Sequence, residues 1–212
     1  MLISDSHEFI FLRMRKVAST SMRDVLEPYC IPVPKGRLTH LKSRARLSMN
    51  YRNHVFRRHE DMVSTRRLMP RALFNRYFKF AFVRNPWERL VSEYIFLLRK
   101  TNHGRHKKVK SLAGFEQFID MQIPRSEAYQ SNMICDRGGR LLVDFIGKME
   151  TLEADWKKVC SKINIEYQPL PHKKNSNRGQ YQEFYTPETI EKVRVHWARD
   201  IALFDYSYDL GS

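Results

Sequence analysis

No apolar stretch of the chain approaches the roughly 18–20 residues that a helix needs to span a bilayer. The first eight residues also lack the basic region and the apolar core of a signal peptide. We therefore expect a cytoplasmic protein with no membrane span. Cysteine is scarce, and Cys30, Cys135 and Cys160 have no metal-ligand spacing. Their odd number predicts free thiols rather than a disulfide framework or a zinc site.

Acidic residues are few: the chain has 23 Asp and Glu against 38 Lys and Arg, which gives a net charge of +15. A field of this sign favours polyanionic partners, namely nucleic acid, an anionic membrane, a sulfated or carboxylated glycan, or a highly charged nucleotide. The imbalance is greatest from Lys35 to Arg76, where twelve basic residues accompany only Glu60 and Asp61. Charge gives the sign of the partner and nothing finer.

The chain also lacks a Walker A loop, Gly-x-x-x-x-Gly-Lys-Ser/Thr. Residues 9–22 nevertheless have the pattern of an anion cradle. The apolar run Phe9–Leu12 predicts a buried strand, and a helical apolar pattern begins at Met22. In the loop between them, free backbone N–H groups and the positive end of the helix dipole would converge, and Lys16 would add a full charge. The hydroxyl groups of this loop belong to Ser19, Thr20 and Ser21.

A second strand–turn–helix unit begins with the apolar run Phe78–Val83. Asn85 suits the N-cap of the helix that follows, and Glu88 is placed to complete a capping box. Arg84 at the strand end and Ser92 in the helix would hold an anionic group through a guanidinium fork and a hydroxyl. Two basic sites at strand ends suggest a ligand with two separated anionic groups.

The rest of the chain alternates short apolar runs with helical patterns. We expect a third strand over 141–146, helices over 115–121, 152–163 and from 187 to about 204, and a basic loop over 99–114. Such alternation predicts one α/β domain over residues 1–212, with a central parallel sheet covered by helices on both faces. Ligands of these sheets bind beyond the carboxyl ends of the strands, where both basic motifs lie.

These residues resemble a known family. Lys16-Val-Ala-Ser-Thr-Ser21 is similar to the 5′-phosphosulfate loop of sulfotransferases, usually Lys-Thr-Gly-Gly-Thr-Ser in the glycan-modifying branch. Phe80 to Tyr94 is similar to the 3′-phosphate motif of that branch, Phe-x-Phe-Val-Arg-Asp/Asn-Pro-x-x-Arg-Leu-Val-Ser-x-Tyr, and this match is long and specific. Residues 142–152 and 198–206 resemble later blocks of the same family, so the resemblance touches most of the chain.

The resemblance implies a three-layer fold like that of P-loop NTPases, and a donor, 3′-phosphoadenosine 5′-phosphosulfate (PAPS), whose sulfuryl group passes to an acceptor hydroxyl without a metal ion. Such a transfer depends on positioning and on neutralisation of charge. Lys16 would neutralise charge on the leaving 5′-phosphate, and Arg84 and Ser92 would bind the 3′-phosphate. The 5′-phosphate itself would be held by the loop residues Ala18, Ser19, Thr20 and Ser21.

Ala18 departs from the family pattern, because the glycan-modifying branch often has glycine at this place. A methyl group is tolerated there only if the residue avoids positive φ. We therefore expect Ala18 to stay out of the left-handed region, with a loop conformation slightly different from that of the glycine-bearing relatives.

The acceptor hydroxyl needs a general base, and in this family a histidine before the second strand often serves. His59 is our first choice, because its distance from the second strand is similar to that of the family's histidine. His40, His54 and Glu60 are the alternatives. A histidine suits proton removal near neutral pH.

The resemblance also gives a role to a late loop. Residues 173–178 are similar to a family segment that closes over the nucleotide, so Ser176 and Arg178 are candidate donor contacts. The basic segment 99–114 has no counterpart in the motifs, and there we expect contacts to an anionic or extended glycan, with His103 and His106 as candidates.

Two other functions are compatible with the charge. A nucleotide-dependent kinase on a related sheet is disfavoured, because the chain lacks both the Walker A loop and an acidic motif for the Mg²⁺ that phosphoryl transfer from ATP normally needs. A non-catalytic polyanion binder is disfavoured, because the sequence has no zinc-finger or RNP-like motif. The interpretation that the resemblance implies, a PAPS-dependent carbohydrate sulfotransferase, is therefore preferred, and we expect no nucleic-acid partner.

Overall fold

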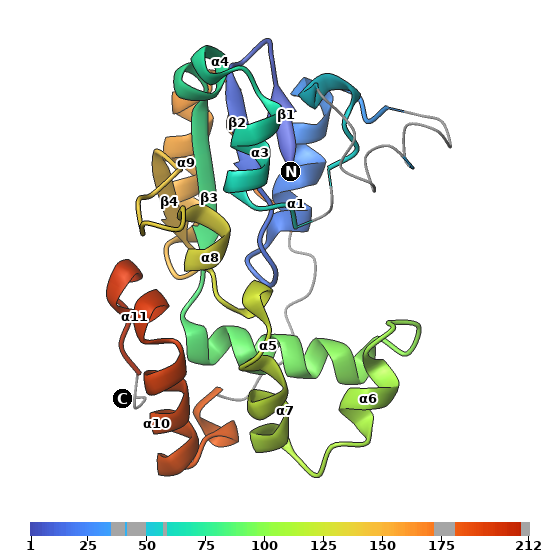
Figure 1. The fold of residues 1–212 in the computed structure, drawn as a ribbon, viewed down its shortest axis with the longest axis vertical. Coiled ribbons are helices and arrows are strands. Elements are labelled where there is room, and N and C mark those ends of the chain that lie inside the picture. The colour runs from blue at the N-terminus through green and yellow to red at the C-terminus, as the bar shows by residue number, and fades with distance from the viewer. Residues whose placement is uncertain (35–40, 42–49, 57–58, 172–180, 209–212) are drawn as a thin grey trace. The chain divides into compact units, whose positions relative to one another are not determined.

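The structure is a computed structural model that describes residues 1–34, 41, 50–56, 59–171 and 181–208. The chain divides into two compact units. The first comprises residues 1–83 and 132–173 and contains the sheet, and the second comprises residues 84–131 and 174–212 and is built from helices (Figure 1). One domain over residues 1–212 stays a prediction.

The sheet of the first unit has the strand order β1-β2-β3-β4. The strands are β1 (Leu2–Ser4), β2 (Phe9–Leu12), β3 (Phe78–Val83) and β4 (Phe145–Lys148). β1 is antiparallel to β2, whereas β2, β3 and β4 are parallel to one another. The side chains of β2 are buried throughout, as expected for a strand covered on both faces. The predicted α/β class with a central parallel sheet is confirmed.

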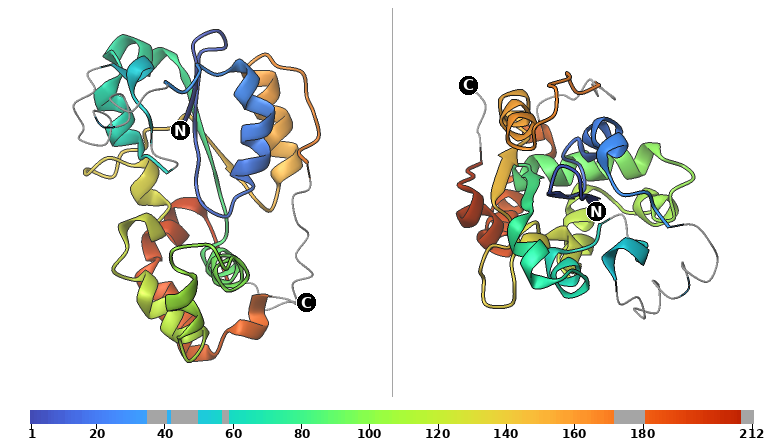
Figure 2. Two further views of the ribbon diagram at one scale, coloured as in Figure 1. Left: turned by 90° about the vertical axis from the view of Figure 1, so that its right-hand side faces the viewer. Right: turned by 90° about the horizontal axis from the view of Figure 1, so that it is seen from above.

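Helices cover both faces of this sheet. α1 (Ser19–Leu26) and α9 (Leu152–Lys162) lie on one face, and α3 (Met62–Leu68) and α4 (Arg71–Arg76) lie on the other (Figure 2). The helical turn η1 (Glu27–Tyr29) follows α1, and the turn η2 (Tyr51–Asn53) precedes α3 in the chain. α8 (Ser131–Ile134) begins at the last residue before the chain returns to this unit. The three-layer arrangement predicted from the sequence is therefore present.

The second unit packs its helices around buried aromatic side chains. Its elements are α5 (Pro86–Arg99), α6 (His106–Lys110), α7 (Phe115–Gln122), η3 (Ser126–Ala128), η4 (Tyr181–Phe184), α10 (Pro187–His196) and α11 (Ala198–Phe204). Trp87 of α5, Phe118 of α7 and Trp197 between α10 and α11 are buried in one apolar cluster. The helix predicted from residue 187 begins there, with Thr186 as its N-cap, but it is broken at Trp197 rather than continuing to residue 204.

The third predicted strand, 141–146, is wrong in its bounds. Leu141 forms only an isolated antiparallel bridge with Cys135, and β4 begins four residues later. Asp144, which directly precedes β4, helps to fix the register of β4 against β3. Its carboxylate accepts hydrogen bonds from both the backbone N–H and the Nζ of Lys79 in β3, each at 2.7 Å. Gly147 fits within β4 because a Cβ there would lie 2.4 Å from the ring of Phe82.

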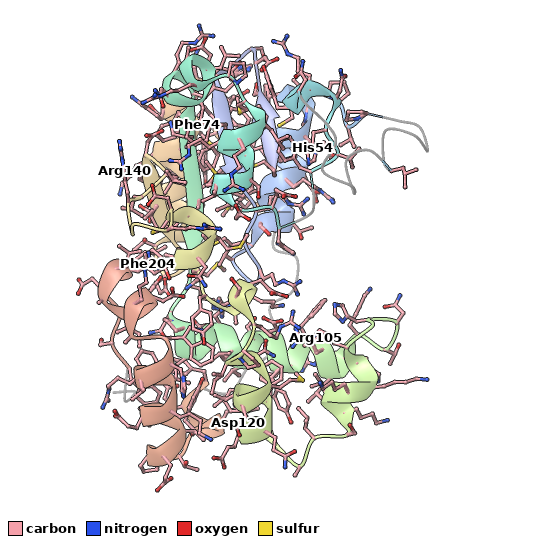
Figure 3. The ribbon with its side chains drawn as sticks, in the orientation of Figure 1. His54, Phe74, Arg105, Asp120, Arg140 and Phe204 are labelled. Carbon is pink, nitrogen blue, oxygen red and sulfur yellow. The ribbon has the colours of Figure 1, made fainter. Side chains whose placement is uncertain are left out.

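The basic loop predicted over residues 99–114 contains a helix, α6. Val109 is buried in the same apolar cluster as side chains of α5. Arg105, which Figure 3 labels, forms an ion pair with the buried Glu93 at 2.8 Å. The Nδ1 of His106 lies 2.9 Å from the carbonyl oxygen of Leu97. One apolar side chain and two polar contacts therefore fix a segment whose sequence is mostly cationic.

Candidate active site

The loop between β2 and α1 contains two residues in the left-handed region. Lys16 has a φ of 65°, and Ala18 has a φ of 55° and a ψ of 14°. The expectation that Ala18 avoids this region is therefore wrong. The left-handed conformation costs a residue with a Cβ about 1–2 kcal/mol, so other contacts must hold the loop in this shape.

Two serine hydroxyls provide such contacts. The Oγ of Ser19 donates to the carbonyl of Met14 at 2.8 Å, and the Oγ of Ser21 donates to the carbonyl of Pro171 at 2.8 Å. Because a hydroxyl has one proton, neither serine can also donate to a phosphate while these bonds persist. The hydroxyl of Thr20 makes no hydrogen bond to any residue within the described ranges, so its proton remains available to a ligand.

The first turn of α1 has the electrostatics of an anion site. The carbonyl of Ala18 accepts the N–H groups of Ser21 (2.9 Å) and Met22 (3.2 Å). The N–H groups of Ser19 and Thr20 precede these donors, so helix geometry gives them no acceptor within α1. This turn of α1 contains no acidic side chain to compensate the positive end of the helix dipole. Two backbone amides and one hydroxyl of this turn are therefore donors that a phosphate oxygen can use.

His59 contacts the residue that follows β2. Its Nδ1 lies 2.8 Å from the carbonyl oxygen of Arg13. A carbonyl oxygen only accepts hydrogen bonds, so Nδ1 carries the proton and Nε2 is the basic nitrogen of the neutral ring. Of the alternatives, His54 and Glu60 are both buried, and His40 lies outside the described residues.

Arg84 directly follows β3, and the side chain of Gln130 holds its main chain. Gln130 Oε1 accepts the N–H of Arg84 at 3.0 Å, and Nε2 donates to its carbonyl at 2.8 Å. The carboxylate of Glu88, expected to bond back to the helix cap, pairs with the guanidinium of Arg84. Asn85 caps α5 as predicted, accepting the N–H of Trp87 at 3.1 Å. A guanidinium has five N–H donors, so it can bind a carboxylate and a phosphate together.

Ser92 lies on α5, eight residues after Arg84, and is only 3% exposed. Its Oγ is buried and has no hydrogen-bond partner in the part of the chain that the structure describes. A buried polar group without a partner costs about 1–3 kcal/mol, and such groups are rare in folded proteins. An oxygen of a bound phosphate would accept this proton. Ser92 and Arg84 therefore form the candidate anion site of the second unit.

Comparison with known proteins supplies the family. A model of the sulfotransferase family matches residues 1–207. The chain belongs to the sulfotransferase family. The resemblance predicted from the motifs around Lys16 and Arg84 is confirmed at the level of the family.

Two relatives differ in how much of the sulfotransferase chain they share. Carbohydrate sulfotransferase 14 from Mus musculus is 25% identical over 221 residues, which cover 92% of this chain and 53% of the mouse protein. An uncharacterized protein from Archaeoglobus fulgidus is 34% identical over 104 residues, which cover 44% of this chain and 72% of the archaeal protein. The chain thus spans about half the length of the mouse relative.

Four further candidate residues, two for the donor and two for the acceptor, are not placed in a binding site by the structure. Ser176 and Arg178 lie outside the described residues. His103 accepts the N–H of Arg105 at 3.1 Å, and His106 contacts a main-chain carbonyl of α5. Both rings therefore take part in folding the α5–α6 corner, whatever they do with an acceptor.

The thiols of the sulfotransferase are free, as predicted, and Cys135 and Cys160 are buried. Burial raises the pKa of Cys30 to about 12 and that of Cys160 to about 11, so both remain protonated at neutral pH. Within the described ranges, no group of three or more His, Cys, Asp or Glu side chains could hold a metal ion. None of the helices described there is long and apolar enough to cross a membrane.

Sequence reasoning missed two residues beside the Arg84 turn. Gln130 lies 46 residues from Arg84 and belongs to no recognisable motif. Asp200 accepts the backbone N–H groups of Gln130 (2.6 Å) and Ser131 (2.9 Å). Its place within the family-like block 198–206 was the one signal that could have drawn attention to it.

Proposed function

We propose that this sulfotransferase transfers the sulfuryl group of PAPS to a hydroxyl group of a carbohydrate. The observation that carries the proposal is the buried Ser92 hydroxyl, which no residue of the described ranges satisfies, eight residues after Arg84. An arginine and a hydroxyl suit the 3′-phosphate, which separates PAPS from ATP-like nucleotides. In support, β2 and β3 are adjacent parallel strands, so the motifs that follow them begin at one edge of the sheet.

Residues of the loop after β2 and His59 have distinct parts in the proposed in-line transfer. The bond between sulfur and the bridging oxygen of the 5′-phosphate breaks as the bond from the acceptor oxygen to sulfur forms. Lys16 neutralises charge on the leaving 5′-phosphate. This phosphate is bound by the backbone amides of Ser19 and Thr20 and by the hydroxyl of Thr20. The Nε2 of His59 takes the proton of the acceptor hydroxyl, and its Nδ1–H, bonded to Arg13, fixes the orientation of the ring.

The carbohydrate acceptor is proposed from two observations. The mouse relative is named a carbohydrate sulfotransferase. The α5–α6 corner is cationic and has no acidic residue between Glu93 and Glu116. Its exposed basic residues are Arg99, Lys100, Lys107, Lys108 and Lys110. A surface of this sign favours an anionic glycan such as one that contains uronate groups.

Calorimetric titration with adenosine 3′,5′-bisphosphate (PAP), the product of the donor, and with ATP tests the donor assignment. We expect PAP to bind far more tightly than ATP. Lys16→Ala and Arg84→Ala should each weaken PAP binding at least tenfold, because a hydrogen bond to a charged group contributes about 1.5–3 kcal/mol. Lys157→Ala, which removes an exposed lysine of α9 paired with Glu153, should retain wild-type affinity. Tighter binding of ATP than of PAP would overturn the assignment.

Turnover tests the general base separately. We expect His59→Ala to bind PAP normally and to lose about 10²–10⁴-fold in turnover, the usual contribution of general base catalysis. His196→Ala, which removes an exposed histidine at the end of α10, is the matched control and should keep its turnover. Wild-type turnover in His59→Ala would transfer the role to His40 or His54.

A further inference from the structure

The side chain of Gln130 makes with the main chain of Arg84, the residue after β3, the pair of hydrogen bonds that a neighbouring strand would make. The ladder between β3 and β4 reaches Val83, whose carbonyl accepts the N–H of Met149 at 2.8 Å. At the next residue, Arg84, the primary amide of Gln130 supplies one acceptor and one donor to the main chain of the same residue, at 3.0 and 2.8 Å. Gln130 is only 2% exposed, so little water competes for these bonds. The backbone of Arg84 is therefore fixed from the side.

Asp200 of α11 in turn holds Gln130. One carboxylate oxygen accepts the N–H of Gln130 at 2.6 Å and the other accepts the N–H of Ser131 at 2.9 Å. Asp200 has no solvent exposure, and the described ranges contain no ion pair for it. A buried carboxylate is costly unless hydrogen bonds satisfy it, so these two amides are strongly held.

The segment that carries Gln130 has further anchors within the second unit. The carbonyl of Ala128 accepts a hydrogen bond from the buried guanidinium of Arg89 and another from Trp197 Nε1 at 3.1 Å. The ring of Tyr129 stacks on Trp197, with centroids 5.2 Å apart and planes 23° from parallel. Side chains of α5 and of the α10–α11 corner therefore hold residues 128–131 in place, and Gln130 cannot shift without breaking these contacts.

We propose that Gln130 and Asp200 are positioning residues for recognition of the 3′-phosphate. The inference rests on the proposed function, because it assumes that Arg84 and Ser92 bind that phosphate. Ser92 is fixed by α5, whereas Arg84 precedes the helix and carries a long side chain. An error of about 1 Å in a positioned group can cost about 100-fold in efficiency. Through Gln130, the carboxylate of Asp200 keeps Arg84 in register with Ser92, although neither Gln130 nor Asp200 touches the ligand.

The test measures discrimination for the 3′-phosphate, which a merely structural role would not change. PAP and adenosine 5′-phosphate are titrated into the same preparation of each variant, and the dissociation constant of adenosine 5′-phosphate is divided by that of PAP to give the discrimination ratio. Because both values come from one preparation, any unfolded fraction cancels in the ratio. We expect Gln130→Met, which keeps the volume and loses both bonds to Arg84, to lower the ratio at least tenfold while adenosine 5′-phosphate binds as before. Asp200→Asn should lower it by a smaller factor.

Gln122→Met is the matched control, because Gln122 of α7 is equally buried and its Nε2 has no partner within the described ranges. Its ratio should equal that of the wild type. If Gln130→Met does not fold, Gln130→Glu retains the acceptor for the N–H of Arg84, loses the donor and should still lower the ratio. An unchanged ratio in these variants, with discrimination lost in Arg84→Ala, would overturn the inference alone. A wild-type protein that does not prefer PAP would overturn the proposed function itself.

Discussion

Ala18 holds its αL conformation without the glycine that usually occupies such a position. Relief of the left-handed conformation favours glycine by about 1–2 kcal/mol, and the greater freedom of glycine in the unfolded chain opposes it by about 0.5–1 kcal/mol. We therefore expect Ala18→Gly to raise the free energy of unfolding by about 0.5–1 kcal/mol, measured by urea titration. Ala72→Gly in helix α4 should lower it by about the same amount. A loss of stability in Ala18→Gly would contradict the strain argument.

At the same scale, the sequence shows which residues can do chemistry but not which of their atoms are engaged. Lys16, Arg84 and the hydroxyl residues could be named as candidates, because basic and small polar side chains directly after buried strands are typical of anion sites. The use of the Ser21 hydroxyl could not, because its acceptor, the carbonyl of Pro171, lies 150 residues away. The same holds for Gln130, whose bonds go to a main chain rather than to a recognisable partner.

At the scale of elements, the carboxylate of Asp5 links the β1–β2 turn to η2 and to the residue that precedes β3. It accepts hydrogen bonds from the hydroxyl of Tyr77 (2.7 Å), the hydroxyl of Tyr51 (2.9 Å) and the Nε of Arg52 (2.8 Å). Burial raises the pKa of Asp5, but these three hydrogen bonds outweigh it and hold the pKa below the ordinary value of 3.8. The ionised carboxylate is therefore the form that the fold stabilises.

This lowered pKa predicts how stability depends on pH. The contribution of Asp5 is fully present well above pH 3.8 and is lost as the pH falls through the lower pKa of the folded state. At pH 7, Asp5→Asn should lower the free energy of unfolding by about 1–3 kcal/mol, and the difference from the wild type should narrow below about pH 4. Asp120→Asn, at an exposed ion pair with Lys192, should change it by less than about 0.5 kcal/mol. If the difference in free energy of unfolding between Asp5→Asn and the wild type stayed constant from pH 7 to pH 3, the charge of Asp5 would be excluded as its cause.

The bounds of β2 and β3 could be predicted to the residue, and those of β1 and β4 could not. β2 is a continuous apolar run and β3 is apolar apart from Lys79, so the end of each strand coincides with the change to a basic residue. β1 has three residues and depends on pairing with β2, which no local pattern reveals. β4 contains Gly147, which the pattern gives no reason to place in a strand until the ring of Phe82 is seen beside it. The α6 helix was missed because one buried side chain, Val109, fixes it.

Over the whole molecule, the net charge of +15 is uneven, and three exposed lysines, Lys107, Lys108 and Lys110, lie within the five residues of α6. Lys107 and Lys110 are three positions apart and so lie on one face of that helix. Exposed charges act over about 10 Å at 0.1 M salt, so their attraction for an anionic acceptor is strongest in dilute buffer. The proposed acceptor thus predicts an effect that depends on both salt and acceptor charge.

We expect the double variant Lys107→Ser/Lys110→Ser to raise the KM for a uronate-bearing polysaccharide about 3–10-fold in dilute buffer, because each exposed contact contributes about 0.2–1 kcal/mol. The KM for a neutral polysaccharide and the affinity for PAP should not change, and about 0.5 M salt should remove most of the difference. Lys157→Ser/Lys162→Ser removes the same charge from α9 and separates a local effect from one of net charge. Equal KM increases in the two double variants would show that only the total charge attracts the acceptor, and no increase in either would exclude α6 from acceptor binding.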